Sequence, residues 1–378
     1  MPAYKNNLEV LIKQDSKQGI GLIDHEQTET FNQWKFRGGL ISIYEENSVY
    51  YESNNPQANK KYLLKVTKQI NQYEIMLHVI QPTFIVVKDI KSANGSQYPI
   101  IANSIIRLGR VEYRVIEERN KEMQITYAET RNQDQLQQND TNKVYQCRFC
   151  FMEGIQSKDQ LFLTNICRCV GNSQAVHLDC MRYWVDSNIT REETQFGLSL
   201  KWNKSHECSI CKESLPVRVQ YENEYFDLFT LERPELQYIL IENVNKEKNV
   251  YGEIYLIHAL LQDNIKLGRG LQCDIKAQDI TVSRHHATIK LSKDNYFVIE
   301  DNRSKFGTLV SINQICQIDC VACSLQIGKL LINLIQSDYI LKGAPSTQHK
   351  LTQLPQISKQ LEEDEPQMDD DSFQLENK

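Results

Sequence analysis

The feature that most constrains this chain is a group of seven cysteines and one histidine between residues 147 and 211. They fall into four close pairs, and each pair presents two soft or borderline ligands that can grip one metal ion. The pairs are Cys147 and Cys150, Cys167 and Cys169, His177 and Cys180, and Cys208 and Cys211. Eight ligands are enough for two closed tetrahedral zinc sites. Disulfides are the alternative use of cysteine, but nothing indicates secretion, and paired spacing in an intracellular chain is typical of metal binding.

The bulk composition is that of an ordinary soluble chain. The 378 residues leave room for two or three domains, with 24% charged and 40% hydrophobic residues. A net charge of −6 gives no electrostatic case for nucleic acid or an anionic membrane as a partner. The first ten residues, MPAYKNNLEV, lack the apolar core of a signal peptide, and no apolar run is long enough to span a membrane. We therefore expect no membrane span and no secretion, which leaves cytoplasm and nucleus both open.

The distribution of apolar residues predicts a mainly β, multidomain fold. Residues 1–122 contain short runs rich in β-branched and aromatic residues, several with period-two alternation, and such runs return over 236–342. Polar composition predicts a linker over 123–143 and a disordered acidic tail over 343–378. The zinc module then occupies 144–218 and a connector 219–235.

The spacing of the eight ligands discriminates among zinc modules. A single residue, Arg168, separates the third and fourth ligands, and seven residues separate Cys169 from His177. The stretches CRCVGNSQAVHLDCMRYW (167–184) and CSICKESLP (208–216) resemble the RING-CH, or RING-variant, family of ubiquitin ligases. The competing module is the PHD finger, a histone-tail reader with a wider third-to-fourth spacing and an aromatic residue where this chain has His206. The gap from Cys180 to Cys208 is long for the RING-CH family, which predicts an enlarged loop around 186–205.

The RING-CH resemblance implies a cross-braced arrangement of two structural zinc ions. One site would consist of Cys147, Cys150, His177 and Cys180, and the other of Cys167, Cys169, Cys208 and Cys211. No catalytic residue is expected, because the chemistry of such ligases is done by a bound, ubiquitin-charged conjugating enzyme. The positions that match the family's conjugating-enzyme surface are Phe149, Trp184, Lys212 and Pro216. The alternative is that Phe149 and Trp184 only pack a small core and that Lys212 is a solvated charge.

The remaining cysteines and His206 give no second metal pattern. His206 is interpreted as a loop residue, because Cys208 and Cys211 form the better pair. Cys316, Cys320 and Cys323 lie in an apolar run without a matching partner pair, and Cys273 stands alone. Free cysteine behaves as a small hydrophobic residue, so we expect these four in the core.

A second constellation follows in the stretches LGRGLQCDI (267–275), ITVSRHHATI (280–289) and DNRSKFGTLV (301–310). Together they resemble a forkhead-associated (FHA) domain, an eleven-stranded β-sandwich whose loops bind phosphothreonine peptides. The resemblance covers about 236–342. It implies a phosphopeptide site that consists of Arg269, Ser283, Arg284 and Lys305, braced by His286. The guanidinium of an arginine offers a planar fork for a phosphate, and a serine hydroxyl can donate to a phosphate oxygen.

Two positions depart from the FHA pattern. The family has Asn before the Gly of the Gly-Thr turn and often another Asn after it, and here these positions are Phe306 and Ser311. We expect the phosphate pocket to survive and the contact with the peptide backbone to be weakened. The alternative is a degenerate FHA fold used only for protein contacts.

The N-terminal region contains a sequence pattern that is similar to the last part of this domain. Residues 104–117, SIIRLGRVEYRVIE, match the pattern of the closing segment SLQIGKLLINLIQ (324–336), and no Ser-x-x-His follows RLGR. We therefore expect residues 1–122 to form a second, degenerate FHA-like sandwich without a phosphate site, in which Arg110 is only a charge at a strand edge.

Together these features predict an E3 ubiquitin ligase that recruits phosphothreonine-containing partners and a ubiquitin-conjugating enzyme. The first alternative is a non-enzymatic phosphopeptide adaptor with a purely structural zinc module. The second is a PHD-like histone reader.

Overall fold

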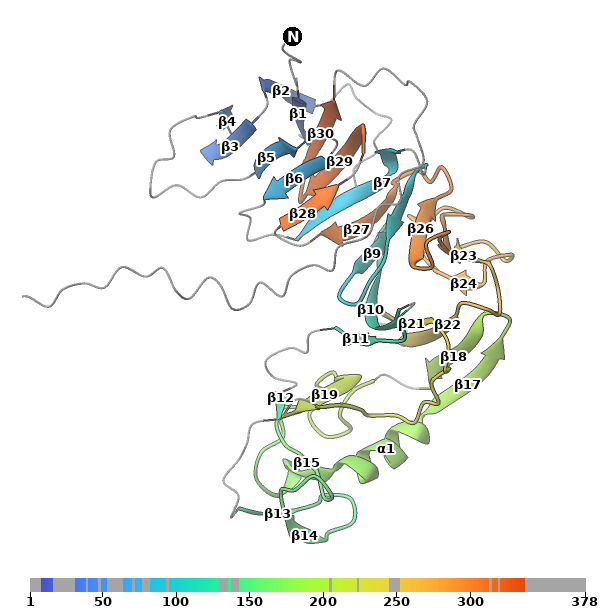
Figure 1. Ribbon diagram of the computed structural model, residues 1–378. Coiled ribbons are helices and arrows are strands. Elements are labelled where there is room, and N and C mark those ends of the chain that lie inside the picture. Colours follow the sequence, from blue (N-terminus) through green and yellow to red (C-terminus); the bar gives the residue numbers. More distant parts are fainter. Residues whose placement is uncertain are drawn as a thin grey trace, which may run out of the picture. The chain divides into compact units, whose positions relative to one another are not determined.

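The structure is a computed structural model. It describes residues 8–15, 31–38, 40–46, 49–52, 64–69, 72–76, 82–92, 95–120, 122–128, 135–136, 143–203, 206–222, 224–244, 252–312, 315–318 and 320–336. Within these ranges strands dominate and the one α-helix is α1 (Leu178–Asp186), which confirms the mainly β fold class (Figure 1). None of the described helices is long and apolar enough to cross a membrane. The expected tail at 343–378 lies outside the described residues.

Two sets of ten strands repeat one pattern of pairing. The first set is β1 (Leu8–Asp15), β2 (Phe31–Gly38), β3 (Leu40–Glu46), β4 (Val49–Glu52), β5 (Leu64–Gln69), β6 (Gln72–Met76), β7 (Thr83–Lys91), β8 (Gln97–Pro99), β9 (Ile105–Leu108) and β10 (Val111–Arg119). The second set is β21 (Tyr238–Asn243), β22 (Glu253–His258), β23 (Asn264–Gly268), β24 (Ile275–Lys276), β25 (Ala287–Leu291), β26 (Phe297–Asp301), β27 (Thr308–Ile312), β28 (Ile315–Ile318), β29 (Ala322–Ile327) and β30 (Leu330–Gln336). In each set the first strand pairs with the second, the third with the fourth and fifth, and the fifth with the sixth.

The last three strands of each set close the other set. Strand β1 pairs with β30 while β21 pairs with β10, and β6 pairs with β28 while β26 pairs with β8. Strand β7 pairs with β29 and β27 with β9, and β7 also pairs with β27. Figure 1 shows this exchange as the blue strand β1 lying beside the orange strand β30. Segment limits such as 1–122 and 236–342 therefore do not by themselves describe the two sandwiches, because each segment supplies strands to both.

The two closing hairpins have the same local design. Each turns at a glycine with positive φ, Gly109 at +60° and Gly328 at +54°, a backbone conformation that other residues rarely adopt. After Gly109 the alternate residues Val111, Tyr113 and Val115 are buried in the sandwich core that also holds Ile265 and its neighbours on the second set. The equivalent residues of β30 pack in the same continuous core with the described residues of β1. Because the two patterns match, the sequence pattern alone does not assign either hairpin to one sandwich.

In the sequence the zinc module comes between the two strand sets, and it has a core of its own. Its elements are β13 (Val144–Gln146), β14 (Glu153–Ile155), β15 (Phe162–Leu163), a 3-10 helix (Gly171–Ser173), β16 (Val176–His177), α1, β17 (Ile189–Thr194) and β18 (Gly197–Trp202). Helix α1 buries Leu178, Met181 and Val185 on one face, a spacing that suits a helix packed against a core. This core extends into the expected connector, where β19 (Arg218–Tyr221) and β20 (Glu224–Asp227) form a hairpin with buried Val219 and Leu228.

The expected enlarged loop around 186–205 contains the hairpin β17–β18. Strand β18 pairs antiparallel with β22, with Gly197 opposite Ile257 and Lys201 opposite Glu253. The zinc module thereby extends the edge of the sheet that contains β22, β21 and β10. The polar linker contributes short strands as well: β11 (Ile125–Tyr127) pairs with β10, and β12 (Gln135–Leu136) pairs with β19.

A buried ionic cluster joins the first strand set, the hairpin β19–β20 and the second strand set. Glu117, at the end of β10, is fully buried and accepts from Arg218 of β19, from Arg233 and from the hydroxyl of Tyr238. Arg218 and Arg233 also pair with Asp227 of β20. Burial alone would raise the pKa of Glu117, but the hydrogen bond from Arg233 and the nearby Arg218 outweigh it and hold that pKa below its usual value. Both carboxylates and both guanidinium groups therefore have charged partners. A buried charge without a partner would lower the stability of the fold, because its loss of hydration would not be offset.

Candidate metal centres and phosphopeptide loops

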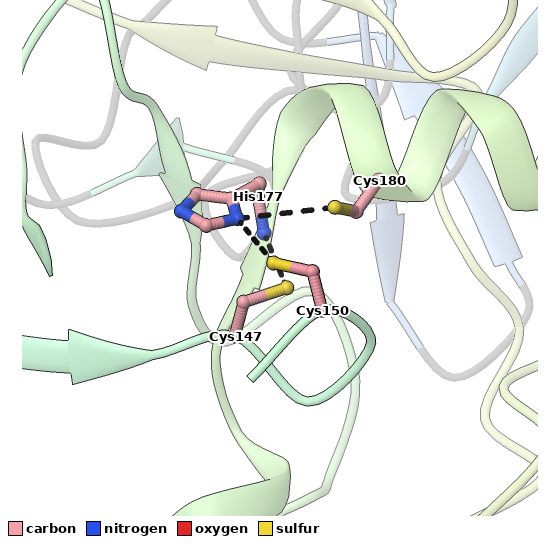
Figure 2. A group of neighbouring side chains, drawn as sticks. All are labelled: Cys147, Cys150, His177 and Cys180. Carbon is pink, nitrogen blue, oxygen red and sulfur yellow. Dashed lines mark hydrogen bonds between the residues drawn. The ribbon is translucent and has the colours of Figure 1, made fainter. Parts of the chain in front are cut away.

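The first ligand cluster gathers residues from three elements. Cys147 and Cys150 lie in the turn after β13, His177 ends β16, and Cys180 lies in the first turn of α1. Their ligand atoms all lie within 4.8 Å of one another, and His177 Nδ1 is 3.3 Å from the Cys150 sulfur and 3.8 Å from the Cys180 sulfur (Figure 2). His177 is the N-cap residue of α1, so the helix itself sets the spacing that turns His177 and Cys180 toward the same point.

The other nitrogen of His177 is oriented by a neighbour. The side-chain amide of Gln160 lies 3.1 Å from His177 Nε2. The atom nearest to Nε2 is the Gln160 amide nitrogen. When Nδ1 binds a metal, Nε2 carries the proton, and a flip of the Gln160 amide then presents its oxygen as the acceptor. A ligating histidine ordinarily has such a partner for its second nitrogen.

The second cluster gathers Cys167 and Cys169 from the segment before the 3-10 helix with Cys208 and Cys211 from the turn that follows β18. Its four sulfurs also lie within 4.8 Å of one another, and the sulfurs of Cys169 and Cys208 are 3.7 Å apart. A tetrahedral zinc with Zn–S bonds of about 2.3 Å holds its sulfurs roughly 3.8 Å apart, so this spacing fits a zinc ion.

Backbone N–H groups favour the thiolate form of Cys147 in the first cluster and of Cys208 in the second. Burial would raise the pKa of Cys147, but the N–H groups of Cys150, His177 and Phe149 outweigh it and lower that pKa. Burial likewise opposes ionisation of Cys208, yet the N–H groups of Cys211 and Ile210 lower its pKa to about 6. Burial and the neighbouring thiols, by contrast, raise the pKa of Cys169 and of Cys180 to about 12. A zinc ligand must be deprotonated, so a bound ion would have to displace these protons. Both sets consist of four side-chain ligands, which leaves no open position for an activated water.

The residues expected on a conjugating-enzyme surface do not all share one environment. Phe149 and Trp184 are half-buried and stack with ring centroids 6.3 Å apart, so they form one continuous aromatic surface. Lys212 is exposed and has a positive φ of 60°. Pro216 differs from the expectation: it is buried, and its carbonyl is 3.2 Å from His206 Nε2, because residues 215–219 run inward toward β19.

Sequence reasoning missed Ile210, which lies between the last two ligands and is 57% exposed. Its place between two paired cysteines, like that of Phe149, is the signal in the sequence that could have singled it out. His206 is no ligand: its ring stacks on Trp202 at 3.7 Å between centroids, and burial lowers its pKa to about 4.

The loops of the second constellation converge through backbone contacts. The N–H of Arg269 donates to the Ser283 carbonyl at 3.1 Å, and the N–H of Gly270 donates to the Arg284 carbonyl at 3.0 Å. A Cβ at Gly268 would lie 2.4 Å from the Arg284 carbonyl oxygen, so this approach requires glycine. The side chains of Arg269, Arg284 and Lys305 are exposed. The structure therefore brings three cations and the Ser283 hydroxyl to one loop cluster.

His286 braces these loops from inside. It is fully buried, its Nδ1 accepts from the Ser283 N–H at 3.1 Å, and its Nε2 donates to the Gly307 carbonyl at 3.2 Å. Burial lowers the pKa of His286, which keeps the ring neutral and able to accept at Nδ1. The Lys305 N–H donates to Ser283 Oγ at 3.1 Å. The hydroxyl proton of Ser283 is then free to point toward a phosphate oxygen.

The two positions that depart from the FHA pattern have clear environments. Phe306 is half-buried, with the Lys305 ammonium 5.3 Å from its ring centroid. Ser311 lies in β27, where its hydroxyl accepts from the Ile105 N–H of β9 at 2.8 Å. Ser311 therefore helps to hold the exchanged strand β9 beside β27.

Of the four cysteines outside the two clusters, Cys273, Cys320 and Cys323 are buried as expected, whereas the side chain of Cys316 lies outside the described residues.

The expectation that Arg110 is an uninvolved strand-edge charge is wrong. Its N–H donates to Thr281 Oγ1 at 3.0 Å, and its Nε lies 3.5 Å from Asp279 Oδ2. The strand exchange is the reason, because it places the turn after β9 against the loop that carries Ser283.

Comparison with known proteins identifies both modules. Residues 147–211 match the family model of the RING-variant domain, and residues 265–331 match that of the FHA domain. The chain thus combines a RING-variant, or RING-CH, domain with an FHA domain, and the PHD alternative falls away.

Among curated proteins, the chain is similar to the E3 ubiquitin-protein ligase MARCHF7 of Pongo abelii, with 34% identity over 87 residues. The same protein of Rattus norvegicus and of Mus musculus is 33% identical over 87 residues. These matches cover 23% of this chain and 10 to 11% of the relatives, so the similarity is confined to the zinc-binding region.

Proposed function

We propose that this chain is an E3 ubiquitin-protein ligase that acts inside the cell, in cytoplasm or nucleus, on phosphothreonine-containing partners. In this proposal the RING-CH domain holds two structural zinc ions and binds a ubiquitin-charged conjugating enzyme. The FHA domain recruits the partner through Arg269, Ser283, Arg284 and Lys305. The observation that carries the proposal is the Phe149–Trp184 stack on a module with two complete four-ligand clusters.

The proposed mechanism needs no catalytic side chain on this chain. Bound zinc would supply folding free energy and a rigid frame. The aromatic pair and exposed Ile210 would seat the conjugating enzyme, and exposed Lys212 would steady its ubiquitin by charge. Rate would then come from holding the thioester and the acceptor amine in a reactive geometry, an effect of proximity and orientation.

Replacing Trp184 by Ala is expected to reduce ubiquitin discharge severely. An aromatic anchor at the centre of an interface contributes about 2 kcal/mol or more, so binding of the conjugating enzyme should weaken by roughly thirtyfold. Single-turnover discharge of ubiquitin from a panel of charged conjugating enzymes measures the effect, with zinc content as a check on folding.

The matched control is Tyr183→Ala, which removes an aromatic residue that is 82% exposed on the same helix. Adjacent helical residues point in different directions, so this change should leave discharge close to that of the wild type. Wild-type protein that discharges no conjugating enzyme in the panel would favour the non-enzymatic adaptor instead.

Replacing Arg269 by Ala is expected to weaken phosphopeptide binding. A hydrogen bond to a charged group contributes about 1.5–3 kcal/mol, which corresponds to roughly a ten- to hundredfold loss of affinity. Fluorescence anisotropy with a degenerate phosphothreonine peptide library, and with its unphosphorylated twin, measures this. Lys293→Ala is the control, because Lys293 is exposed in the turn at the other end of β25 from Ser283. Equal affinity of the wild type for both libraries would reduce the domain to a structural sandwich.

A further inference from the structure

The loop that carries Ser283 has an internal frame built on Asp279. Asp279 Oδ1 accepts from the Thr281 N–H at 2.7 Å and from the Thr281 hydroxyl, and the Val282 N–H donates to the Asp279 carbonyl at 3.1 Å. Thr281 is therefore the residue through which this frame can be held from outside, because its hydroxyl oxygen still has room to accept a hydrogen bond.

The exchanged hairpin of the first strand set supplies that external contact. Arg110 donates its backbone N–H to the Thr281 hydroxyl at 3.0 Å, and its Nε lies 3.5 Å from Asp279 Oδ2, within ion-pair distance but without a hydrogen bond. Gly109 packs so closely that a Cβ there would lie 2.3 Å from Thr281 Oγ1. Although burial opposes ionisation of Asp279, the bonds from Thr281 and the charge of Arg110 lower its pKa.

A second contact comes from β7, which precedes the exchanged strands of the first set, and reaches the other loop. Lys88 of β7 is half-buried, with its ammonium 3.5 Å from the carbonyl oxygens of Ser304 and Lys305. Each of these contacts is long, but together they hold two successive carbonyl groups of the loop against one ammonium group. The loop is also fastened from within, since Asp301 accepts from the Ser304 N–H at 2.9 Å and from the Thr308 hydroxyl at 2.7 Å. The loop of Ser283 and the loop of Lys305 meet at the bond from the Lys305 N–H to Ser283 Oγ.

We propose that Arg110 and Lys88 are positioning residues of the phosphopeptide site, so that the N-terminal strands form a working part of the FHA domain. Neither residue needs to touch the peptide: Arg110 holds the loop 279–283 through Thr281 and Asp279, and Lys88 holds the loop 304–307. This inference rests on the proposed recognition of phosphothreonine. If removal of either contact leaves the loops ordered only about a tenth of the time, affinity falls about tenfold, because apparent affinity scales with the competent fraction.

The test uses the full chain with the substitutions Arg110→Ala, Lys88→Ala and Thr281→Val. Arg110→Ala removes the guanidinium near Asp279 but keeps the backbone N–H, and Thr281→Val removes the acceptor of that N–H. Thr281→Val keeps the shape of the side chain but removes the hydroxyl, whereas Thr281→Ser keeps the hydroxyl and should restore binding. The matched control is Lys329→Ala, because Lys329 follows Gly328 in the equivalent turn of the other hairpin and is exposed. Two readouts are taken: affinity for the degenerate phosphothreonine library, and amide hydrogen exchange over residues 279–284 and 304–307.

The expected result is about a tenfold loss of affinity and faster exchange in the three variants, with Thr281→Ser and Lys329→Ala close to the wild type. The inference is overturned if Arg269→Ala loses binding while Arg110→Ala, Lys88→Ala and Thr281→Val change neither readout; the proposed function would then stand. If the wild type does not distinguish the phosphorylated library, the proposed recognition falls. In that case the exchange readout still decides: unchanged protection in all three variants refutes the positioning role, and its loss with rescue by Thr281→Ser supports it.

Discussion

Cutting the chain between the two strand sets is expected to leave both pieces bound to each other. A protease site placed within residues 129–134 would separate β1–β10 from the zinc module and β21–β30. Each piece supplies the closing strands of the other, so the pieces share the pairs β1–β30, β10–β21, β7–β29 and β9–β27. The buried cores of both sandwiches span the cut.

Size-exclusion chromatography of the cut protein measures this directly, next to the uncut chain with the same inserted site. The two pieces should elute together at nanomolar concentration and separate only in the denaturant range that unfolds the uncut chain. If the pieces separate in native buffer, each strand set closes on itself. The chain would then contain two consecutive sandwiches, as the sequence predicted, and the strand exchange would be refuted.

Replacing Cys167 by Ser is expected to unfold the zinc module. Binding of a structural zinc ion contributes roughly 10–16 kcal/mol to the fold of small zinc domains, more than the net stability of most domains. The core around α1 should lose amide protection and zinc content should fall below two ions per chain, as measured by hydrogen exchange and metal analysis. The core shared by the two strand sets contains no residue of this module apart from Phe196, so it should persist.

One neighbouring strand should report the loss of zinc. Strand β22 pairs with β18 of the zinc module on one edge and with β21 on the other. Its amides that face β18 should therefore become unprotected while those that face β21 stay protected. The matched control is Cys273→Ser, a buried cysteine outside both clusters, which should leave zinc content unchanged. Full protection of the α1 core in Cys167→Ser would contradict a structural role for the metal.

The zinc ligands could be predicted from the sequence because their chemistry is local. Two ligands separated by one or two residues must face one ion, so spacing alone pairs Cys147 with Cys150 and Cys208 with Cys211, and the structure gathers the same residues. The FHA loops were predicted from the family resemblance that their motifs carry, and the FHA family model matches residues 265–331. The burial of Pro216 was not predictable, because it depends on the path of the chain into β19.

The exchange of closing strands was beyond the reach of sequence patterns. Residues 104–117 and 324–336 carry the same alternation and the same turn glycine, so the pattern identifies two closing hairpins without assigning either to a sandwich. The role of Arg110 depends on that assignment, which is why it could be mistaken for an isolated charge. The pairing of β18 with β22 was hidden for the same reason: an enlarged loop signals an insertion, but not the strand edge on which it docks.

The exchange also sets a problem of timing during synthesis. Strand β10 ends at residue 119 and β28 begins at residue 315, so 195 residues are made between them. At about 5–20 residues per second this interval lasts roughly 10–40 seconds, far longer than the microseconds in which a hairpin forms. In that interval β1 can pair only with strands that the ribosome has already released. Strand β10 is one of these, and it has the same pattern as β30, the strand with which β1 pairs in the structure. A nascent chain that closes on itself in this way must reopen before β21 can receive β10.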